Sequence, residues 1–253
     1  MEYETILVEK ILGGITVKFN RLERQNTINV ALIKELNHVL SIAQEDSDCR
    51  VVVLEGQQGV FCTGMDFSEV AKGGSDEFST SGYMETIKGF ASSPKVIISS
   101  VDGRVMAGGV GIVAASDLVI ATPRSQFSLS EILWGLLPAC VIPYLIRRVG
   151  FQKAYSMTLT TQPISAKEAH ASHLVDEISE TPEDNIRKLL LRLRRLEESD
   201  IANMKRYFRK MWMIDEEMEE TAVAEISRLV SAPKVTENIR NFVEHQKFPW
   251  ENK

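Results

Sequence analysis

The distribution of strand-like and helical segments along the 253 residues is the feature that most restricts the fold. Short apolar runs typical of buried strands, such as 51–54 and 96–99, fall in the first two-thirds of the chain. Helical spacing dominates the last third, at 184–196, 201–213 and 216–230. A doubly wound fold would instead alternate strands and helices throughout. The sequence therefore predicts a β-rich core followed by a helical C-terminal region.

Local signals add several elements to this pattern. The β-rich segments 5–12 and 15–19 flank the turn signal Gly13-Gly14 and predict a hairpin. A helix is predicted at 30–43, and strands at 61–66 and 118–121. Residues 72–82, rich in Gly and Ser, predict a mobile loop. Ser165 and Glu168 have the spacing of a capping box, which predicts a helix start.

Composition and domain organisation are those of an ordinary globular protein. Hydrophobic residues make up 44% of the chain and charged residues 25%. No linker-like stretch interrupts the sequence, so we expect one continuous domain, with a core at 1–195 and a helical region at 196–253. The net charge of -6 gives no electrostatic footprint for nucleic acid.

No targeting, membrane or metal signal is present in the sequence. The first ten residues lack an apolar signal segment, and no run reaches the roughly 20 apolar residues that span a membrane. Cys49, Cys62 and Cys140 lack metal-ligand spacing, and we expect them to be free thiols in a reducing compartment. His170 and His173 lie at helical spacing without a third ligand. A cytoplasmic protein without a metal ion is expected.

Two segments combine a strand, a glycine turn and a helix. The first reads Phe-Cys-Thr-Gly-Met-Asp at 61–66, and the second Met-Ala-Gly-Gly-Val-Gly at 106–111. The start of a helix presents backbone N–H groups without intrahelical partners, and these bind negative charge. Each turn alone is weak evidence, because glycine before a helix usually makes only a tight connection. Neither turn has the spacing of a nucleotide-binding loop.

Together the two turns resemble those of the crotonase (enoyl-CoA hydratase/isomerase) superfamily, whose first turn has the pattern Phe-x-x-Gly-x-Asp-Leu. The similarity continues through 127–136 and 161–178 in family order. It implies an α/β fold, a crotonase spiral of ββα units with a helical C-terminal trimerisation region. It also implies a homotrimer or hexamer, and a substrate carried as a thioester on CoA or phosphopantetheine, with no further cofactor.

The resemblance places the catalytic groups position by position. The oxyanion hole, which stabilises an enolate, falls on the backbone N–H groups of Met65 and Gly108. Family hydratases use two glutamates, and this chain has Gly111 at the first position and Glu131 at the second. Glu131 is therefore the main candidate for proton transfer.

Two aspartates, Asp66 and Asp117, lie near the two glycine turns. Asp66 adjoins Met65 and is a second catalytic candidate. Its spacing from Glu69 is that of a capping box, however, which favours a structural role for Asp66. Asp117, which precedes a strand, is also assigned a structural role.

A narrower resemblance rests on 26–29, 127–133, 137–143, 145–148 and 248–250. These segments are similar to those of the dehydratases of polyketide β-branching cassettes. The implied reaction is dehydration of 3-hydroxy-3-methylglutaryl-acyl carrier protein to 3-methylglutaconyl-acyl carrier protein. The implied partners are the acyl carrier protein and a downstream decarboxylase of the same family.

Two other functions stay open at this point. One is a CoA-linked enoyl-CoA hydratase of branched-chain acyl catabolism. The other is a catalytically idle crotonase fold that binds a carrier protein or RNA. The sequence does not decide between CoA and carrier protein, or between trimer and hexamer. It also does not identify the group that binds the distal carboxylate of the substrate, for which Arg104 and the segment 72–82 are candidates.

Overall fold

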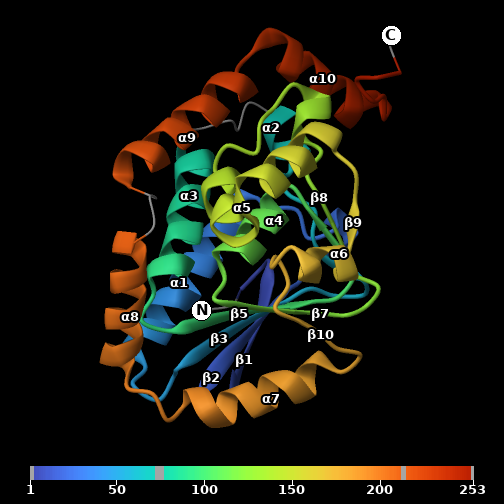
Figure 1. Ribbon diagram of the computed structural model, residues 1–253. Coiled ribbons are helices and arrows are strands. Elements are labelled where there is room, and N and C mark those ends of the chain that lie inside the picture. The colour runs from blue at the N-terminus through green and yellow to red at the C-terminus, as the bar shows by residue number, and fades with distance from the viewer. Residues whose placement is uncertain (1–2, 72–76, 212–214, 252–253) are drawn as a thin grey trace.

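The computed structural model describes residues 3–71, 77–211 and 215–251, which fold around two β-sheets (Figure 1). The larger sheet has six strands in the order β1-β2-β3-β5-β7-β10, and the smaller has four in the order β4-β6-β8-β9. The larger sheet comprises β1 (Ile6–Ile11), β2 (Gly14–Phe19), β3 (Val51–Glu55), β5 (Val96–Val101), β7 (Leu118–Ala121) and β10 (Glu177–Ile178). The smaller comprises β4 (Val60–Cys62), β6 (Arg104–Met106), β8 (Gln126–Ser128) and β9 (Ile164–Ser165).

Consecutive strands between β3 and β8 alternate between the two sheets. Strands β3, β5 and β7 lie side by side and parallel in the larger sheet, while β4, β6 and β8 do the same in the smaller. Each pair of strands is thus one turn of a spiral that repeats along the chain. This arrangement confirms the predicted spiral of ββα units and the absence of a doubly wound sheet.

Helices cover both faces of the larger sheet. Helix α7 (Pro182–Leu193) lies across the face opposite to α1 (Val30–Glu45) and α3 (Glu77–Ser92), as Figure 1 shows. A separate apolar cluster lies under α7, where Ile186 packs with residues of β3 and β5 such as Val53 and Ile98. The other helices are α2 (Phe67–Ala71), α4 (Gly108–Ala115), α5 (Val141–Thr160), α6 (Ala166–Ala171), α8 (Glu198–Met211), α9 (Glu216–Val230) and α10 (Pro233–His245).

Three local predictions need correction. The hairpin turn is Leu12-Gly13 and not Gly13-Gly14, because Ile11 pairs with Gly14. Gly14 instead lets β3 approach closely, since a Cβ there would lie 2.5 Å from the carbonyl oxygen of Val51. The loop predicted at 72–82 is helical from residue 77, and 72–76 lie outside the described residues.

The third correction is an addition, because helix α10 was not predicted. Its sequence signals are present nonetheless. Pro233 stands at the first helical position, and Val235, Ile239, Phe242 and Val243 recur at helical spacing. By contrast, the capping box of Ser165 and Glu168 is confirmed at the start of α6.

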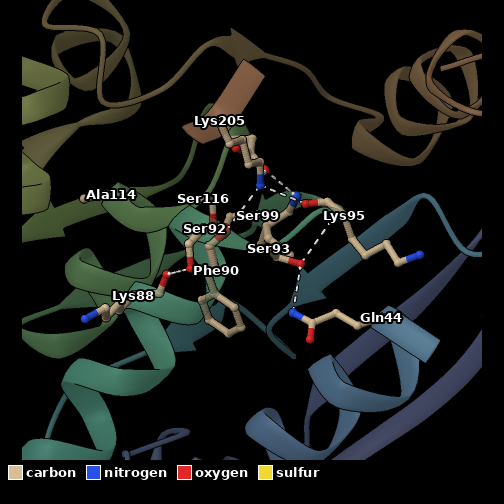
Figure 2. Close-up of polar contacts among 12 residues, drawn as sticks. Gln44, Lys88, Phe90, Ser92, Ser93, Lys95, Ser99, Ala114, Ser116 and Lys205 are labelled. Atoms are coloured by element: carbon tan, nitrogen blue, oxygen red, sulfur yellow. Dashed lines mark hydrogen bonds and ion pairs between the residues drawn. The ribbon is translucent and has the colours of Figure 1, made fainter. Parts of the chain in front are cut away.

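Two buried lysines fix helix α8 to strand β5 (Figure 2). Lys205 Nζ lies 2.6 Å from Asp117 Oδ2 and donates to the carbonyl oxygen of Lys95 at 2.8 Å. Lys95 Nζ, itself buried, pairs with Glu198 Oε2 at 2.7 Å. Asp117 also accepts the N–H of Ile97 at 2.7 Å, which agrees with its predicted structural role. Among the described helices, none is long and apolar enough to cross a membrane.

Candidate active site

A cavity of about 680 Å³ forms where the two glycine turns meet helix α10. Its wall also includes the 3-10 turn η2 (Glu131–Trp134) and the segment that leads into α5. Met65, Asp66, Gly108 and Glu131 all line this cavity. The fold therefore gathers the four residues that the sequence singled out, from segments up to 66 positions apart, at one site.

The Met65 peptide is held from both sides by Ile28. The Ile28 N–H donates to the carbonyl oxygen of Gly64 at 2.7 Å, and the Asp66 N–H donates to the carbonyl oxygen of Ile28 at 2.9 Å. Between these two bonds, the N–H of Met65 has no acceptor among the described residues. A fixed backbone donor without a protein partner is what an oxyanion hole requires.

The Gly108 peptide is fixed by an unusual backbone conformation at Ala107. Ala107 has φ 50° and ψ -122°, a region that residues other than glycine rarely adopt. Its N–H donates to the carbonyl oxygen of Ser128 at 3.0 Å, and α4 begins directly after it. The N–H of Gly108 is therefore an unpaired first-turn donor within the described part of the chain, at the positive end of the α4 dipole.

The two turns touch each other, which explains the glycine in the first one. Gly64 has φ 88°, and a Cβ on it would lie 2.6 Å from the Ala107 Cβ and 3.2 Å from the Gly108 nitrogen. Any side chain at 64 would separate the two turns. Gly64 therefore keeps the Met65 and Gly108 donors at one end of the cavity.

The Glu131 carboxylate is buried and incompletely paired. Its Oε2 atom has no hydrogen-bond partner among the described residues. Burial raises the pKa of Glu131 to about 7, and the nearby N–H groups of Glu131 and Ser130 offset this only in part. A carboxyl group with a pKa near neutrality can both take and return a proton, as a general base and acid must.

The Asp66 carboxylate, unlike that of Glu131, accepts hydrogen bonds at both of its oxygens. Oδ2 accepts from Arg21 Nη2 at 2.9 Å and from the Thr27 hydroxyl at 3.2 Å, and Oδ1 accepts from the Ser68 N–H at 3.0 Å. Burial pushes the pKa of Asp66 up, but these bonds, above all those with Arg21, hold it below its usual value. Asp66 thus caps α2 and stays ionised, an arrangement that supports a structural role and gives a poor proton donor.

The capping box predicted between Asp66 and Glu69 does not form. Glu69 Oε2 accepts instead from the N–H of Val30, the first residue of α1, at 3.2 Å. Glu69 therefore links α2 to the start of α1. The Asp66 N–H, which a capping box would have used, is taken by Ile28.

The chain is similar to known proteins along most of its length. The profile of the Enoyl-CoA hydratase/isomerase family matches residues 11–253. The chain belongs to this family. It is 41% identical over 254 residues to the bacillaene synthase dehydratase PksH of Bacillus subtilis, covering 99% of this chain and 98% of PksH. It is 32% identical over 180 residues to the mitochondrial enoyl-CoA hydratase of Pongo abelii, covering 70% and 62% of the two chains.

The solved structures support the same assignment. The crystal structure of PksH from Bacillus subtilis superposes with a TM-score of 0.92 at 38% identity, covering 98% of this chain and all of that one. Pseudomonas aeruginosa AtuE superposes with a TM-score of 0.78 at 27% identity over 98% and 99% of the two chains. The chain is accordingly an enzyme of the enoyl-CoA hydratase/isomerase family, with a mixed α/β crotonase fold and hydro-lyase chemistry.

Position 111 distinguishes the site of this enzyme from the two-glutamate pattern. Gly111 lies one turn after Gly108 on α4, is buried, and supplies no carboxylate. The neighbouring polar group is the hydroxyl of Tyr83, a cavity residue from α3 that is not among the residues predicted from the sequence. No local pattern marks Tyr83 in the sequence, because a tyrosine on an amphipathic helix is usually a packing residue.

Two arginine side chains also line the cavity. Arg24 and Arg104 both line the cavity, are exposed, and form no ion pair among the described residues. Arg104 therefore remains a candidate for binding an anionic part of the substrate. No group of three or more His, Cys, Asp or Glu side chains within 3–71, 77–211 and 215–251 could hold a metal ion.

Proposed function

We propose that this enzyme dehydrates 3-hydroxy-3-methylglutaryl-acyl carrier protein to 3-methylglutaconyl-acyl carrier protein in polyketide β-branching. The observation that carries the proposal is the buried Glu131 carboxylate, which shares one cavity with two unpaired backbone donors. The site has no second carboxylate at position 111, which is glycine. The full-length similarity to a dehydratase of bacillaene synthase supports the choice of pathway.

The first step is removal of the proton at C2. The thioester carbonyl accepts hydrogen bonds from the N–H groups of Met65 and Gly108. Glu131, in its ionised carboxylate form, removes the proton from C2. The electron pair of the broken C2–H bond moves onto the carbonyl oxygen, which gives an enolate. One such backbone donor typically stabilises the transition state by about 2.7–4 kcal/mol.

The second step expels water. The enolate returns its electrons to form the C2–C3 double bond, and the C3–O bond breaks. The proton on Glu131 passes to the departing hydroxyl, which leaves as water, and Glu131 returns to its carboxylate form. One carboxyl group is sufficient because the proton that it takes is the proton that it delivers.

The same site would act without a bound cofactor, because the acyl group arrives on its own phosphopantetheine arm. The conjugated product carries a carboxylate that a decarboxylase of the same family could then remove. The cationic side chains of Arg24 and Arg104 suit the phosphate of that arm or the distal carboxylate of the substrate.

A CoA-linked enoyl-CoA hydratase is the second candidate, favoured by the similarity to the mitochondrial hydratase of Pongo abelii. Gly111 counts against it, since the family pattern of hydration uses a carboxylate at that position. An idle binding protein is disfavoured because a protein without chemistry has no need of a strained Ala107 and a buried, unpaired carboxylate.

The test is a mass measurement on the carrier protein. An acyl carrier protein loaded with 3-hydroxy-3-methylglutaryl phosphopantetheine is incubated with the enzyme, and we expect the mass to fall by one water. The Glu131→Gln variant is the matched control, and 3-hydroxy-3-methylglutaryl-CoA is the competing substrate. Equal or faster turnover of the CoA form, or hydration of crotonyl-CoA at a higher rate, would favour the second candidate.

A further inference from the structure

Position 111 on α4 is blocked by the hydroxyl of Tyr83. A Cβ built on Gly111 would lie 2.1 Å from Tyr83 Oη and 3.0 Å from Val141 Cγ2. Real Cβ atoms do not approach another atom as closely as the first of these distances, so only glycine fits beneath this tyrosine. The phenolic oxygen thus stands where a side chain from position 111 would begin.

Tyr83 is held in this place by two contacts. Its hydroxyl donates to the carbonyl oxygen of Gly108 at 2.6 Å, beside the proposed oxyanion donor. Its helix α3 packs tightly on α1, where a Cβ on Gly82 would lie 3.2 Å from Ile33 and a Cβ on Gly89 would lie 3.0 Å from Leu40. Tyr83 is half-buried and lines the cavity, so the oxygen is fixed and remains within reach of a ligand.

The Tyr83 phenol stays neutral in this environment. Burial raises its pKa well above the usual value, and the charges of neighbouring groups, Cys140, Cys62 and Glu131 among them, raise it further. Because the single O–H is donated to Gly108, the remaining lone pairs of the oxygen can only accept hydrogen bonds. Tyr83 is therefore suited to receive an O–H group and unsuited to act as a base.

We propose that Tyr83 is a further catalytic residue, whose oxygen takes the place of the missing side chain at 111 and accepts a hydrogen bond from the C3 hydroxyl of the substrate. This inference rests on the proposed dehydration. The bond orients the hydroxyl so that its own lone pair faces the proton carried by Glu131. Tyr83 loses and gains no proton: C3–O breaks, the Glu131 proton completes the water, and the phenol is unchanged.

The deciding experiment compares two reactions of the Tyr83→Phe variant. Dehydration of the 3-hydroxyacyl thioester requires the C3 hydroxyl, whereas exchange of the C2 proton with D₂O in a 3-methylglutaryl thioester does not. We expect Tyr83→Phe to slow dehydration about 10- to 100-fold, the size of one lost directed hydrogen bond, while C2 exchange stays within about twofold of the wild type. Tyr144→Phe is the matched control, since Tyr144 is a buried tyrosine on α5 outside the cavity wall, and both of its rates should be normal.

The two reactions separate a catalytic role from a structural one. If Tyr83 only orders the Gly108 turn, exchange and dehydration fall together, and the inference is overturned. Unchanged dehydration in Tyr83→Phe also overturns it. If the wild type dehydrates 3-hydroxybutyryl-CoA but not the 3-hydroxy-3-methylglutaryl thioester, the proposed function is wrong. The role of Tyr83 is then tested by comparing the wild type and Tyr83→Phe with 3-hydroxybutyryl-CoA. A wild type that exchanges C2 protons but dehydrates neither thioester rejects both.

A double-mutant measurement tests the geometric premise separately. Gly111→Ala should lower the melting temperature of the wild type, because the new Cβ meets Tyr83 Oη. The Tyr83→Phe variant lacks the hydroxyl, and the ring carbon Cζ of residue 83 lies 3.3 Å from the Cβ built at position 111. In that background Gly111→Ala should therefore lower the melting temperature by less. Equal losses in both backgrounds would show that the tyrosine oxygen does not occupy this space.

Discussion

At the residue scale, the chemistry depends most on the contrast between two carboxylates in one cavity. Both oxygens of Asp66 accept hydrogen bonds, from Arg21, Thr27 and the Ser68 N–H, whereas Glu131 keeps a buried oxygen without a partner among the described residues. Environment, and not residue type, therefore assigns the roles. The paired carboxylate is held ionised and supports the fold, and the unpaired one is poised for proton transfer.

Replacing Glu131 by Gln should nearly abolish turnover. The amide keeps the shape of the side chain but can neither take the C2 proton nor return it, so we expect a loss of at least about 100-fold in kcat with little change in KM. Steady-state kinetics on the loaded carrier protein measure both. A variant that kept more than about a tenth of the rate, a deficit under ~1.4 kcal/mol, would show that another group is the main base.

The pH dependence of kcat/KM should follow the ionisation of Glu131. Its pKa is raised to about 7 by burial, and only the carboxylate form can accept the C2 proton. We therefore expect kcat/KM to fall about tenfold per pH unit below about 7 and to level off above it. Initial rates between about pH 5.5 and 8.5, with circular dichroism to exclude unfolding, test this. A flat profile down to about pH 5.5 would contradict the assignment.

Asp66→Asn should affect stability more than catalysis. The amide oxygen can still accept from the Ser68 N–H, but the substitution removes the charge that pairs with Arg21, whose side chain is only 13% exposed. A cost of about 1–3 kcal/mol in unfolding free energy is expected, with kcat within severalfold of the wild type. Chemical denaturation and kinetics on the same preparation measure the two effects. A loss of activity as large as that of Glu131→Gln in a folded protein would make Asp66 a catalytic partner.

At the element scale, the strength of the local signal decides what the sequence could predict. Helix α9 was predicted at its observed bounds, since its apolar positions recur at helical spacing. The sequence predicts a loop at the start of α3 because Gly and Ser conceal the helical period there, whereas in the fold α3 packs on α1. Met65, Gly108 and Glu131 were found through family motifs. Tyr83 was not, because its role arises from the space above Gly111, which only the fold creates.

The lysine cluster beneath α8 gives an element-scale prediction. Lys205→Met would leave the half-buried Asp117 carboxylate without the cation that it pairs with, and we expect a loss of about 3 kcal/mol in unfolding free energy. The double variant Asp117→Asn with Lys205→Met should recover much of this loss, because no unpaired charge remains. Denaturant unfolding of the three proteins measures the effect. Equal stability of Lys205→Met and the wild type would show that the ion pair does not hold α8 in place.

At the scale of the whole molecule, large apolar side chains are exposed on two helices of the described part of the chain. Phe151 and Tyr155 on α5 are 65% and 54% exposed, and Tyr207 and Phe208 on α8 are 61% and 67% exposed. Exposed aromatic residues grouped in this way commonly mark surfaces that bind another protein. The crotonase resemblance implies that the partner is a second copy of the chain, in a trimer or hexamer.

The mass of the particle in solution tests this expectation. Light scattering should give three or six chain masses, and Phe208→Glu should shift the protein towards smaller species by placing a charge in the contact. Leu12→Glu is the matched control, because Leu12 is 74% exposed at the tip of the β1–β2 hairpin, and the substitution there should leave the mass unchanged. If the wild type were monomeric at every concentration, the exposed faces of α5 and α8 would have to bind a different protein. The acyl carrier protein would then be the first candidate, and titration with the loaded carrier would show whether Phe208→Glu raises KM without altering kcat.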